Sequence, residues 1–369
     1  MNSPRGPGRL TRAKGGGSQS PRNARAHCSL AAPPASYGKF CSMRIRKTVF
    51  AILASPAATL CAAALFAGIS SARGAPAAGG AQGIVENIAS ASGASVAVAA
   101  VCEGETVASL NAGMRVPLMS VFKFHTALAY LDMLSERGED ALGKIRVEPG
   151  DLHKNTHSPM RDKMPPDGFE ISRADLLRFM ISESDNNACD IIIRECGGTG
   201  EIMRRLERLG DCGDARISAD ENSMQLDVEN QRLNTATAEG CARLLGRFLK
   251  GEILPPRYAG ILKKALEDCA TGKDKIPAGL PETAPSGHKT GSSSRLPSGV
   301  KIADNDLGFA ELPDGRILCI AVFVTDSRQS DAKNAATIAE ITRAAWADAS
   351  QNMKGATPGA AQNSGAARD

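Results

Sequence analysis

The chain has 369 residues, which is enough for two ordinary domains or for one large domain with tails. Hydrophobic residues make up 42% and charged residues 23%, and these globular values exclude a fibrous or wholly disordered protein. The formal charge of +4 is misleading, because residues 1–75 hold eleven Lys or Arg and no acidic residue. The remainder carries 33 basic and 40 acidic residues, so the charge balance does not predict a nucleic-acid partner.

The basic start of the chain has the pattern of an export signal. A short cationic segment begins at Met43, and the apolar stretch 49–70 after it ends in small residues that suit a signal peptidase. Pro56 disfavours a stable membrane-spanning helix, so we expect a signal peptide over residues 43–75, no stable membrane anchor and a periplasmic protein. Residues 1–42, rich in Gly, Pro, Ser and Arg, are expected to be a non-structural extension.

Seven cysteines follow the expected signal peptide: Cys102, Cys189, Cys196, Cys212, Cys241, Cys269 and Cys319. An exported protein can form disulfides, but an odd count leaves at least one thiol free, and the sequence leaves the pairing open. The chain has no Cys-x-x-Cys motif, and His153 and His157 lie four apart in a Pro-rich stretch rather than on a helix. We therefore expect no metal site and no cofactor.

Periodicity and turn residues predict the elements in chain order. Helices are expected at 82–92, about 120–136, 173–182, 188–195, 200–209, 237–249, 256–268 and 330–349. Strands are expected at 95–102, 106–111, around 288–290, 302–312 and 317–324. Two stretches, 138–168 and 215–234, lack periodicity and are predicted to be loops.

This order of strands, helices and strands predicts a helical domain inserted into a sheet domain whose two ends come together. We place the sheet domain at 76–116 and 270–350, and the helical domain at 117–269. Residues 351–369 are expected to be a disordered tail. A cleft between the two domains is the expected site of function.

The first candidate site lies at the start of the helix expected at about 120–136. Ser120 and Lys123 are three apart, so both side chains lie on the same face of that helix. A serine hydroxyl becomes a good nucleophile when a neighbouring base accepts its proton, and an uncharged lysine amine can do so. The motif alone is weak, because residues 298–301 repeat the Ser-x-x-Lys spacing where a turn is predicted.

Three further pieces are expected to converge on the cleft. Residues 184–186 read Ser-Asp-Asn and lie between two predicted helices, where a short turn leaves their side chains free. Residues 289–291 read Lys-Thr-Gly on a predicted strand, and the glycine lets a substrate approach the backbone closely. Glu221 lies in the polar loop. Each piece alone is also compatible with an ordinary turn or strand.

Together, and in this order, these motifs resemble those of the class A serine β-lactamases, and the resemblance covers about residues 82–350. The stretch 219–225 resembles the corresponding loop of the extended-spectrum subgroup. The resemblance implies an α/β fold, an α+β sandwich with a five-stranded antiparallel sheet flanked by helices and an inserted all-helical domain. It also implies hydrolysis of penicillins or cephalosporins, hence antibiotic resistance, by a monomer.

The resemblance implies catalytic roles for Ser120, Lys123, Ser184 and Glu221. It implies substrate binding by Asn186, Lys289, Thr290, Gly291, Ser292, Lys275 and His157. Ser120 would attack the β-lactam carbonyl, Ser184 would pass a proton to the leaving nitrogen, and Glu221 would activate the hydrolytic water. Whether Lys123 or Glu221 accepts the serine proton is left open.

The chain departs from the family pattern around Glu221 and at the edge of the cleft. Gln225 stands where many members have asparagine, and Ala219 and Asn234 occupy positions that often form an Arg–Asp ion pair. Lys275 stands where the subgroup usually has an arginine, and lysine lacks the bidentate fork. His157 takes a place usually held by an aromatic residue.

Two alternatives stay open at this stage, a penicillin-binding transpeptidase or carboxypeptidase and a non-hydrolytic penicillin sensor. Both would share the serine, the lysine and the Lys-Thr-Gly strand, but they lack a carboxylate such as Glu221 and stay acylated. The sequence does not predict which β-lactams are preferred.

Overall fold

A computed structural model of the protein describes residues 80–351. The expected extension at 1–42, the expected signal peptide at 43–75 and the expected tail beyond residue 351 lie outside the described residues. No helix within residues 80–351 combines the length and the apolar character needed to cross a bilayer.

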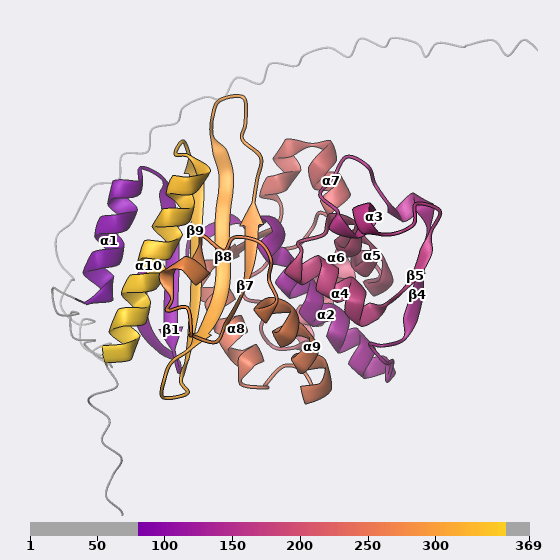
Figure 1. The fold of residues 1–369 in the computed structure, drawn as a ribbon, viewed down its shortest axis with the longest axis horizontal. Coiled ribbons are helices and arrows are strands. Elements are labelled where there is room, and N and C mark those ends of the chain that lie inside the picture. Colours follow the sequence, from indigo (N-terminus) through magenta and orange to yellow (C-terminus); the bar gives the residue numbers. More distant parts are fainter. Residues whose placement is uncertain (1–79, 352–369) are drawn as a thin grey trace, which may run out of the picture. The chain divides into compact units, whose positions relative to one another are not determined.

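A five-stranded antiparallel sheet forms one layer of the fold, with strand order β2–β1–β9–β8–β7 (Figure 1). The strands are β1 (Ser95–Cys102), β2 (Glu105–Leu110), β7 (Ser286–Ser292), β8 (Lys301–Glu311) and β9 (Ile317–Ser327). Ser95 pairs with Thr325, so the first strand lies beside the last one. The predicted fold class, with a five-stranded antiparallel sheet flanked by helices, is confirmed.

Both faces of this sheet are covered, because successive side chains of a strand point to opposite faces. Val96 and Val98 of β1 pack under α1 (Ala81–Ser92) and α10 (Asp331–Gln351), which lie together on one face (Figure 1). Ala97 of β1 belongs instead to the larger core shared with the helical part. Because both faces of these strands are buried, apolar residues occur at consecutive positions and the strands appear in the sequence as continuous hydrophobic runs.

The helical part is built around α2 (Phe122–Arg137). Every residue from 122 to 131 is buried, as expected for a helix packed on all sides. Its neighbours are α4 (Arg173–Ser182), α5 (Asn186–Cys196), α6 (Thr199–Arg208) and α9 (Pro256–Glu267), and α8 (Ala238–Leu249) packs against the sheet. These helices end within two residues of the predicted positions. The predicted domain boundaries at 117 and 269 stay a prediction.

The two stretches predicted to be loops contain short elements, and there the prediction is wrong. The first holds β4 (Lys144–Val147), η2 (Pro149–Asp151) and α3 (Pro159–Lys163), and the second holds α7 (Glu221–Leu226) and η3 (Val228–Arg232). β4 pairs with β5 (Phe169–Ser172), which follows the first stretch. Outside both stretches, β3 (Arg115–Pro117) pairs with β6 (Thr235–Thr237), and η1 (Met119–Val121) and η4 (Ile276–Gly279) are short helical turns. Elements of three to six residues are too short to show a period in the sequence.

The seven cysteines of the described part are free thiols. Burial raises the pKa of Cys319 to about 12 and of Cys196 to about 12, so these thiols stay neutral and pack as small apolar side chains. Cys269 is the exception, because its pKa is lowered to about 7.

Candidate active site

The chain around Ser120 is held in a strained turn against the sheet. Residues Met119–Val121 form one turn of 3₁₀ helix just before α2, and Met119 has a positive φ of 48°, which is unfavourable for a residue with a side chain. The side-chain amide of Asn305 on β8 donates to the carbonyl of Pro117 at 2.8 Å and holds the approach to this turn. The strain is therefore stored directly beside the predicted nucleophile.

Lys123 lies at the centre of the polar groups. Its Nζ is 3.1 Å from Ser120 Oγ and 2.8 Å from Glu221 Oε1, and its side chain has no exposed surface. It also donates to Asn186 Oδ1 at 2.6 Å and to the carbonyl of Ser184 at 2.8 Å. The structure thus brings four residues from three separate stretches of sequence into contact with one buried amine. A buried charge needs such partners to be tolerated.

The Ser-Asp-Asn tripeptide forms the turn between α4 and α5. Ser184 has a positive φ of 57°, and the carboxylate of Asp185 caps α5 by accepting the backbone N–H of Ala188 at 2.8 Å. This cap fixes the turn, so Asn186 stays beside Lys123 and its amide donates to Thr156 Oγ1 at 2.7 Å.

Lys289 extends from β7 toward the same turn. Its Nζ donates to Ser184 Oγ at 2.9 Å. Burial, followed by the positive charge of Lys123, lowers the pKa of Lys289 to about 7. Ser184 therefore lies between two amines that are both buried, where a proton can pass between its hydroxyl and Lys289.

The rest of the β7 motif reaches the turn before Ser120. A Cβ added at Gly291 would lie 2.3 Å from the carbonyl oxygen of Leu118, so only glycine fits there. Thr290 is buried with its hydroxyl 2.6 Å from that of Thr271, whereas Ser292 is exposed and lines the cavity.

Glu221 is positioned by the first turn of the unexpected helix α7. Asp220 caps this helix by accepting a backbone N–H of the first turn. The carboxylate of Asp190 on α5 accepts the backbone N–H of Glu221 at 2.8 Å and that of Asn222 at 2.9 Å. As a result, Glu221 Oε1 lies 3.5 Å from Ser120 Oγ.

Asp190 is a site residue that the sequence reasoning missed. Burial raises its pKa to about 7, and the nearby charges of Glu221 and Asp220 add to the effect. One weak signal was present: Asp190 follows Asn186 by four residues, so a helix starting in the Ser-Asp-Asn turn puts both on one face.

The segment before α7 is braced without the ion pair expected in the family. The side-chain oxygen of Asn234 accepts the backbone N–H groups of Ser218 and Ala219, at 2.9 and 3.0 Å, and its amide donates to the Ala219 carbonyl at 2.8 Å. Three neutral hydrogen bonds from one buried side chain take the place of a charge pair. Gln225 lines the cavity beyond Glu221.

The two remaining predicted residues lie apart from this group. Lys275 is buried, and its Nζ is 2.6 Å from Asp304 Oδ1 and 3.3 Å from the Asn305 carbonyl. It does not line the cavity that contains Ser120. His157 is exposed at the rim of that cavity, and its Nε2 lies 3.0 Å from the carbonyl of Glu183. The binding roles predicted for both residues stay predictions.

A cavity of about 490 Å³ opens over these groups. Its polar lining includes Ser120, Thr156, Asn186, Glu221 and Ser292. Within residues 80–351, no three His, Cys, Asp or Glu side chains come close enough to one another to hold a metal ion. The arrangement offers a hydroxyl nucleophile, amines and a carboxylate for proton transfer, and open space for a small molecule.

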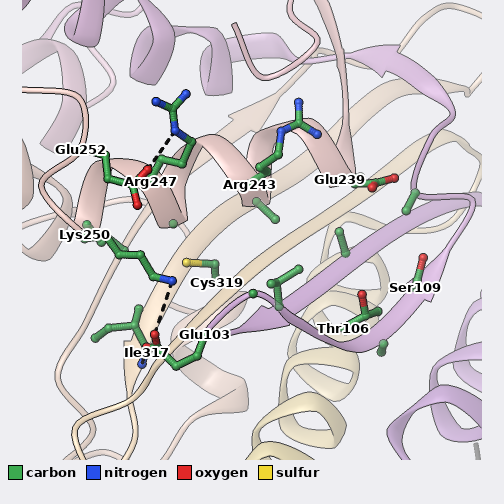
Figure 2. A pocket seen from close by; sticks show the side chains of 18 residues that line it. Glu103, Thr106, Ser109, Glu239, Arg243, Arg247, Lys250, Glu252, Ile317 and Cys319 are labelled. Atoms are coloured by element: carbon green, nitrogen blue, oxygen red, sulfur yellow. Dashed lines mark hydrogen bonds and ion pairs between the residues drawn. The ribbon is translucent and has the colours of Figure 1, made fainter. Parts of the chain in front are cut away.

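A second cavity, of about 460 Å³, lies between α8 and the strands β1 and β2 (Figure 2). Its floor consists of small or apolar residues such as Ala99, Ala108 and Cys319, and charged side chains surround it. Two pairs of these charges are drawn in Figure 2, Lys250 with Glu103 and Arg247 with Glu252. None of the predicted site residues lines it.

Comparison with known proteins agrees with the geometry around Ser120. The sequence model of a group described as the beta-lactamase enzyme family matches residues 81–349. The chain belongs to the β-lactamase enzyme family. This β-lactamase is 36% identical over 260 residues to a β-lactamase of Bacteroides uniformis, covering 70% of this chain and 88% of the relative. It is 31% identical over 265 residues to β-lactamase VEB-1 of Pseudomonas aeruginosa, covering 71% and 88%.

A solved structure identifies the class of this β-lactamase. A class A β-lactamase from Bacteroides cellulosilyticus is 39% identical, with a TM-score of 0.70, covering 74% of this chain and 99% of that protein. The protein is therefore a class A β-lactamase, as its motifs predicted.

Proposed function

We propose that this class A β-lactamase hydrolyses the β-lactam ring of penicillins and cephalosporins through an acyl-enzyme on Ser120, and so confers antibiotic resistance. One observation carries the proposal. The Ser120 hydroxyl lies 3.1 Å from an amine, Lys123 Nζ, and 3.5 Å from a carboxylate, Glu221 Oε1. A nucleophile with both groups in reach can be acylated and then freed by water.

In acylation, Ser120 Oγ forms a bond to the lactam carbonyl carbon and its proton passes to the Lys123–Glu221 pair. The carbonyl oxygen gains negative charge in the tetrahedral intermediate, and backbone N–H groups of Ser120 and Ser292 would stabilise that charge. The ring C–N bond then breaks. Ser184 gives its proton to the leaving nitrogen. Lys289 Nζ, which donates to the Ser184 hydroxyl at 2.9 Å, can then replace that proton.

Substrate binding uses the groups around the cavity. Lys289, Thr290 and Ser292 would hold the substrate carboxylate through charge-assisted hydrogen bonds. Asn186 would hold the side-chain amide of the substrate. Its own oxygen is anchored by Lys123 at 2.6 Å, and its amide nitrogen, which donates to Thr156 Oγ1 at 2.7 Å, would donate to the substrate instead.

In deacylation, Glu221 accepts a proton from a water molecule, and the water oxygen attacks the ester carbonyl. The ester bond to Ser120 breaks, the serine recovers its proton, and the opened lactam leaves with one water added. Asp190 supports this step because it holds the backbone of Glu221 and Asn222 by two hydrogen bonds.

Steady-state turnover of nitrocefin by the purified protein tests the proposal. A β-lactamase gives many turnovers per serine, whereas a penicillin-binding transpeptidase or sensor gives one stoichiometric burst. The absence of turnover together with a stable acyl adduct on Ser120 would refute hydrolysis. Relatives named for an extended spectrum include PER-1 of Pseudomonas aeruginosa, so cephalosporins are included in the proposal.

The protein is further proposed to act as a periplasmic monomer after removal of residues 43–75. The support is the cationic and apolar pattern of that segment. Cell fractionation with N-terminal sequencing of the mature chain tests export, and light scattering of the purified protein tests the monomer. A full-length protein recovered from the cytoplasm contradicts the first point, and a dimer contradicts the second.

A further inference from the structure

A buried cluster of three ionisable side chains lies behind the substrate-binding strand β7. His288 on β7 has its Nδ1 3.0 Å from both carboxylate oxygens of Asp306 on β8. Within residues 80–351, the other ring nitrogen, Nε2, has no hydrogen-bond partner, and the charge of the ring acts on the nearby thiol of Cys269. Cys269 follows α9 and is wholly buried, as is Asp306. None of these side chains has a role in the proposed reaction.

The cluster is connected through two threonines to the Lys-Thr-Gly motif of β7. Cys269 Sγ lies 3.5 Å from Thr271 Oγ1, which lies 2.6 Å from Thr290 Oγ1. In both contacts either partner can donate the hydrogen. An unbroken chain therefore runs from Cys269 to the Thr290 hydroxyl, which is expected to donate to the substrate carboxylate.

We propose that Cys269 is a positioning residue whose proton sets the direction of the hydrogen bonds in this chain, and with it the ability of Thr290 to donate to the substrate. The inference rests on the proposed function. It differs from that function in assigning a pH response to residues that never touch the substrate.

The two protonation states give opposite directions. As a thiol, Cys269 donates its one hydrogen to Thr271, whose carbonyl lies 3.6 Å and whose hydroxyl lies 3.5 Å from Sγ, so Thr271 can donate to Thr290 and the Thr290 hydrogen is free for the substrate carboxylate. As a thiolate, Cys269 can only accept, so Thr271 donates to it and then accepts the hydrogen of Thr290. The substrate carboxylate then faces the lone pairs of Thr290. Loss of one proton from Cys269 thus removes one hydrogen bond from substrate binding.

The groups around Cys269 place this change near neutral pH. Burial alone would raise the pKa of Cys269, but the neighbouring His288, together with Lys289 and Thr271, lowers it to about 7. Burial opposes a charge on His288 too, yet Asp306 and Cys269 raise its pKa to about 10. His288 is therefore an imidazolium whose positive charge acts on Cys269 in both states.

Lys289 is a competing source of pH dependence. Its pKa is lowered to about 7 by burial and by Lys123, while the charges of Cys269, Asp306 and Glu221 act to raise it. If Cys269 acted only as a negative charge that supports Lys289, its removal would lower the lysine pKa further. The loss of activity would then begin at lower pH. The proposed chain instead predicts that removal of Cys269 makes the loss of activity with rising pH smaller. Cys269→Ser therefore separates the two explanations.

The experiment measures kcat and kcat/KM for a penicillin from about pH 6 to about pH 8.5 in the wild type, Cys269→Ser and Thr271→Val. A serine at 269 stays neutral and keeps donating to Thr271. In the wild type we expect kcat/KM to fall about tenfold over this range, the size of one hydrogen bond to a charged group, with a smaller change in kcat. In Cys269→Ser the fall should be at most about threefold, with kcat/KM at low pH unchanged.

Thr271→Val interrupts the chain while leaving Cys269 in place. We expect the fall that is due to Cys269 to disappear in this variant, which leaves a profile as shallow as that of Cys269→Ser, at a value below that of the wild type at low pH. The ultraviolet absorbance of the thiolate, taken relative to Cys269→Ser, should still titrate near neutral pH in it. Cys319→Ser is the control and should keep the wild-type profile, because Cys319 is another buried cysteine but lies on β9, which β8 separates from β7.

A Cys269→Ser profile that equals the wild-type profile or falls at lower pH would overturn the inference while hydrolysis itself stands. Absence of hydrolysis in the wild type would instead overturn the proposed function. Should Cys269→Ser fail to fold, Thr271→Val decides alone, because a wild-type pH profile in it contradicts a chain through Thr271.

Discussion

The two cavities of the molecule have similar volumes, about 490 and about 460 Å³, but their charged groups are arranged in opposite ways. At the first, the side chains of Lys123 and Glu221 are 0% and 9% exposed, and the lysine shares its amine among several partners. At the second, Lys250 and Glu103 are 47% and 42% exposed and form an ordinary surface pair at 3.5 Å (Figure 2). Volume alone does not distinguish the two.

The contrast shows that a reactive site is recognised by polar groups that are buried and that share hydrogen-bond partners. An exposed ion pair is worth little because water screens it, whereas buried charges interact strongly and perturb one another. Near the first cavity the pKa values of Lys289 and Asp190 are both moved to about 7, while at the second Cys319 is only made harder to ionise. Four predictions test this contrast.

The largest effect is expected from Ser120→Ala. Loss of the nucleophile should reduce kcat for nitrocefin on the order of 10⁴-fold or more, because no acyl-enzyme can form. Ser109→Ala, which removes a hydroxyl from the lining of the second cavity, is the matched control and should keep wild-type kcat. Thermal melting of both variants should match the wild type. Turnover that survives in Ser120→Ala would remove Ser120 from the reaction.

Glu221→Gln should act on the second half of the reaction. We expect acylation to continue while deacylation slows by about 10²- to 10⁴-fold, since a general base for water is lost. A stopped-flow burst followed by slow turnover, with the adduct mass on intact protein, measures this. Glu239→Gln at the second cavity is the control and should show no burst. Equal slowing of both steps would instead identify Glu221 as the base for Ser120 as well.

Lys275→Ala should affect stability more than catalysis. It leaves Asp304, which is 3% exposed, without the amine that lies 2.6 Å away. Breaking a buried pair on one side costs about 3 to 5 kcal/mol in free energy of unfolding. Lys301 also lies 3.2 Å from Asp304 and should reduce the loss toward the lower figure.

Lys250→Ala breaks the exposed pair at the second cavity and is the matched control for Lys275→Ala. Its cost should be at most about 1 kcal/mol, and urea denaturation measures both variants. Equal losses in the two variants would contradict the contrast between buried and exposed pairs.

The smallest expected effect concerns Asp190 and pH. Its pKa of about 7 in the folded protein lies above the ordinary value of 3.8, so the folded state binds this proton more tightly. The resulting stabilisation is fully present below about pH 4 and is lost as the pH rises through about 7. Asp190→Asn carries no such proton, so its stability should fall less over this range, by on the order of 2 kcal/mol. Identical pH dependence in both proteins would place the titration elsewhere.

Most of the fold could be predicted because the long elements show their period in the sequence. The helix predicted at 173–182 is α4 itself, and the strand predicted at 95–102 is β1. The segment containing α7 was read as a loop, although Asp220 before it and Ser223 in its first turn form an N-terminal cap that could have been recognised. β4 and β5 have only four residues each, and no local signal connects them across the loop between.

The site could be predicted as far as it consists of motifs. Ser120, Lys123, Ser184 and Glu221 do meet in the structure, although their roles in catalysis stay predictions. Asp190 was missed because its partners are backbone N–H groups 31 and 32 residues away, and such contacts leave no pattern in the chain. For the same reason the sequence did not connect Cys269 with His288 and Asp306.

The place of β9 between β1 and β8 constrains how the molecule can be made. The hairpin of β1 and β2 is synthesised early, but its neighbour in the sheet, β9, is the last strand of the described chain to leave the ribosome. Pairing Ser95 with Thr325 closes a loop that contains almost all of the structured chain, and such distant contacts slow folding. The five-stranded sheet therefore cannot be completed until β9 has been synthesised and has paired with β1.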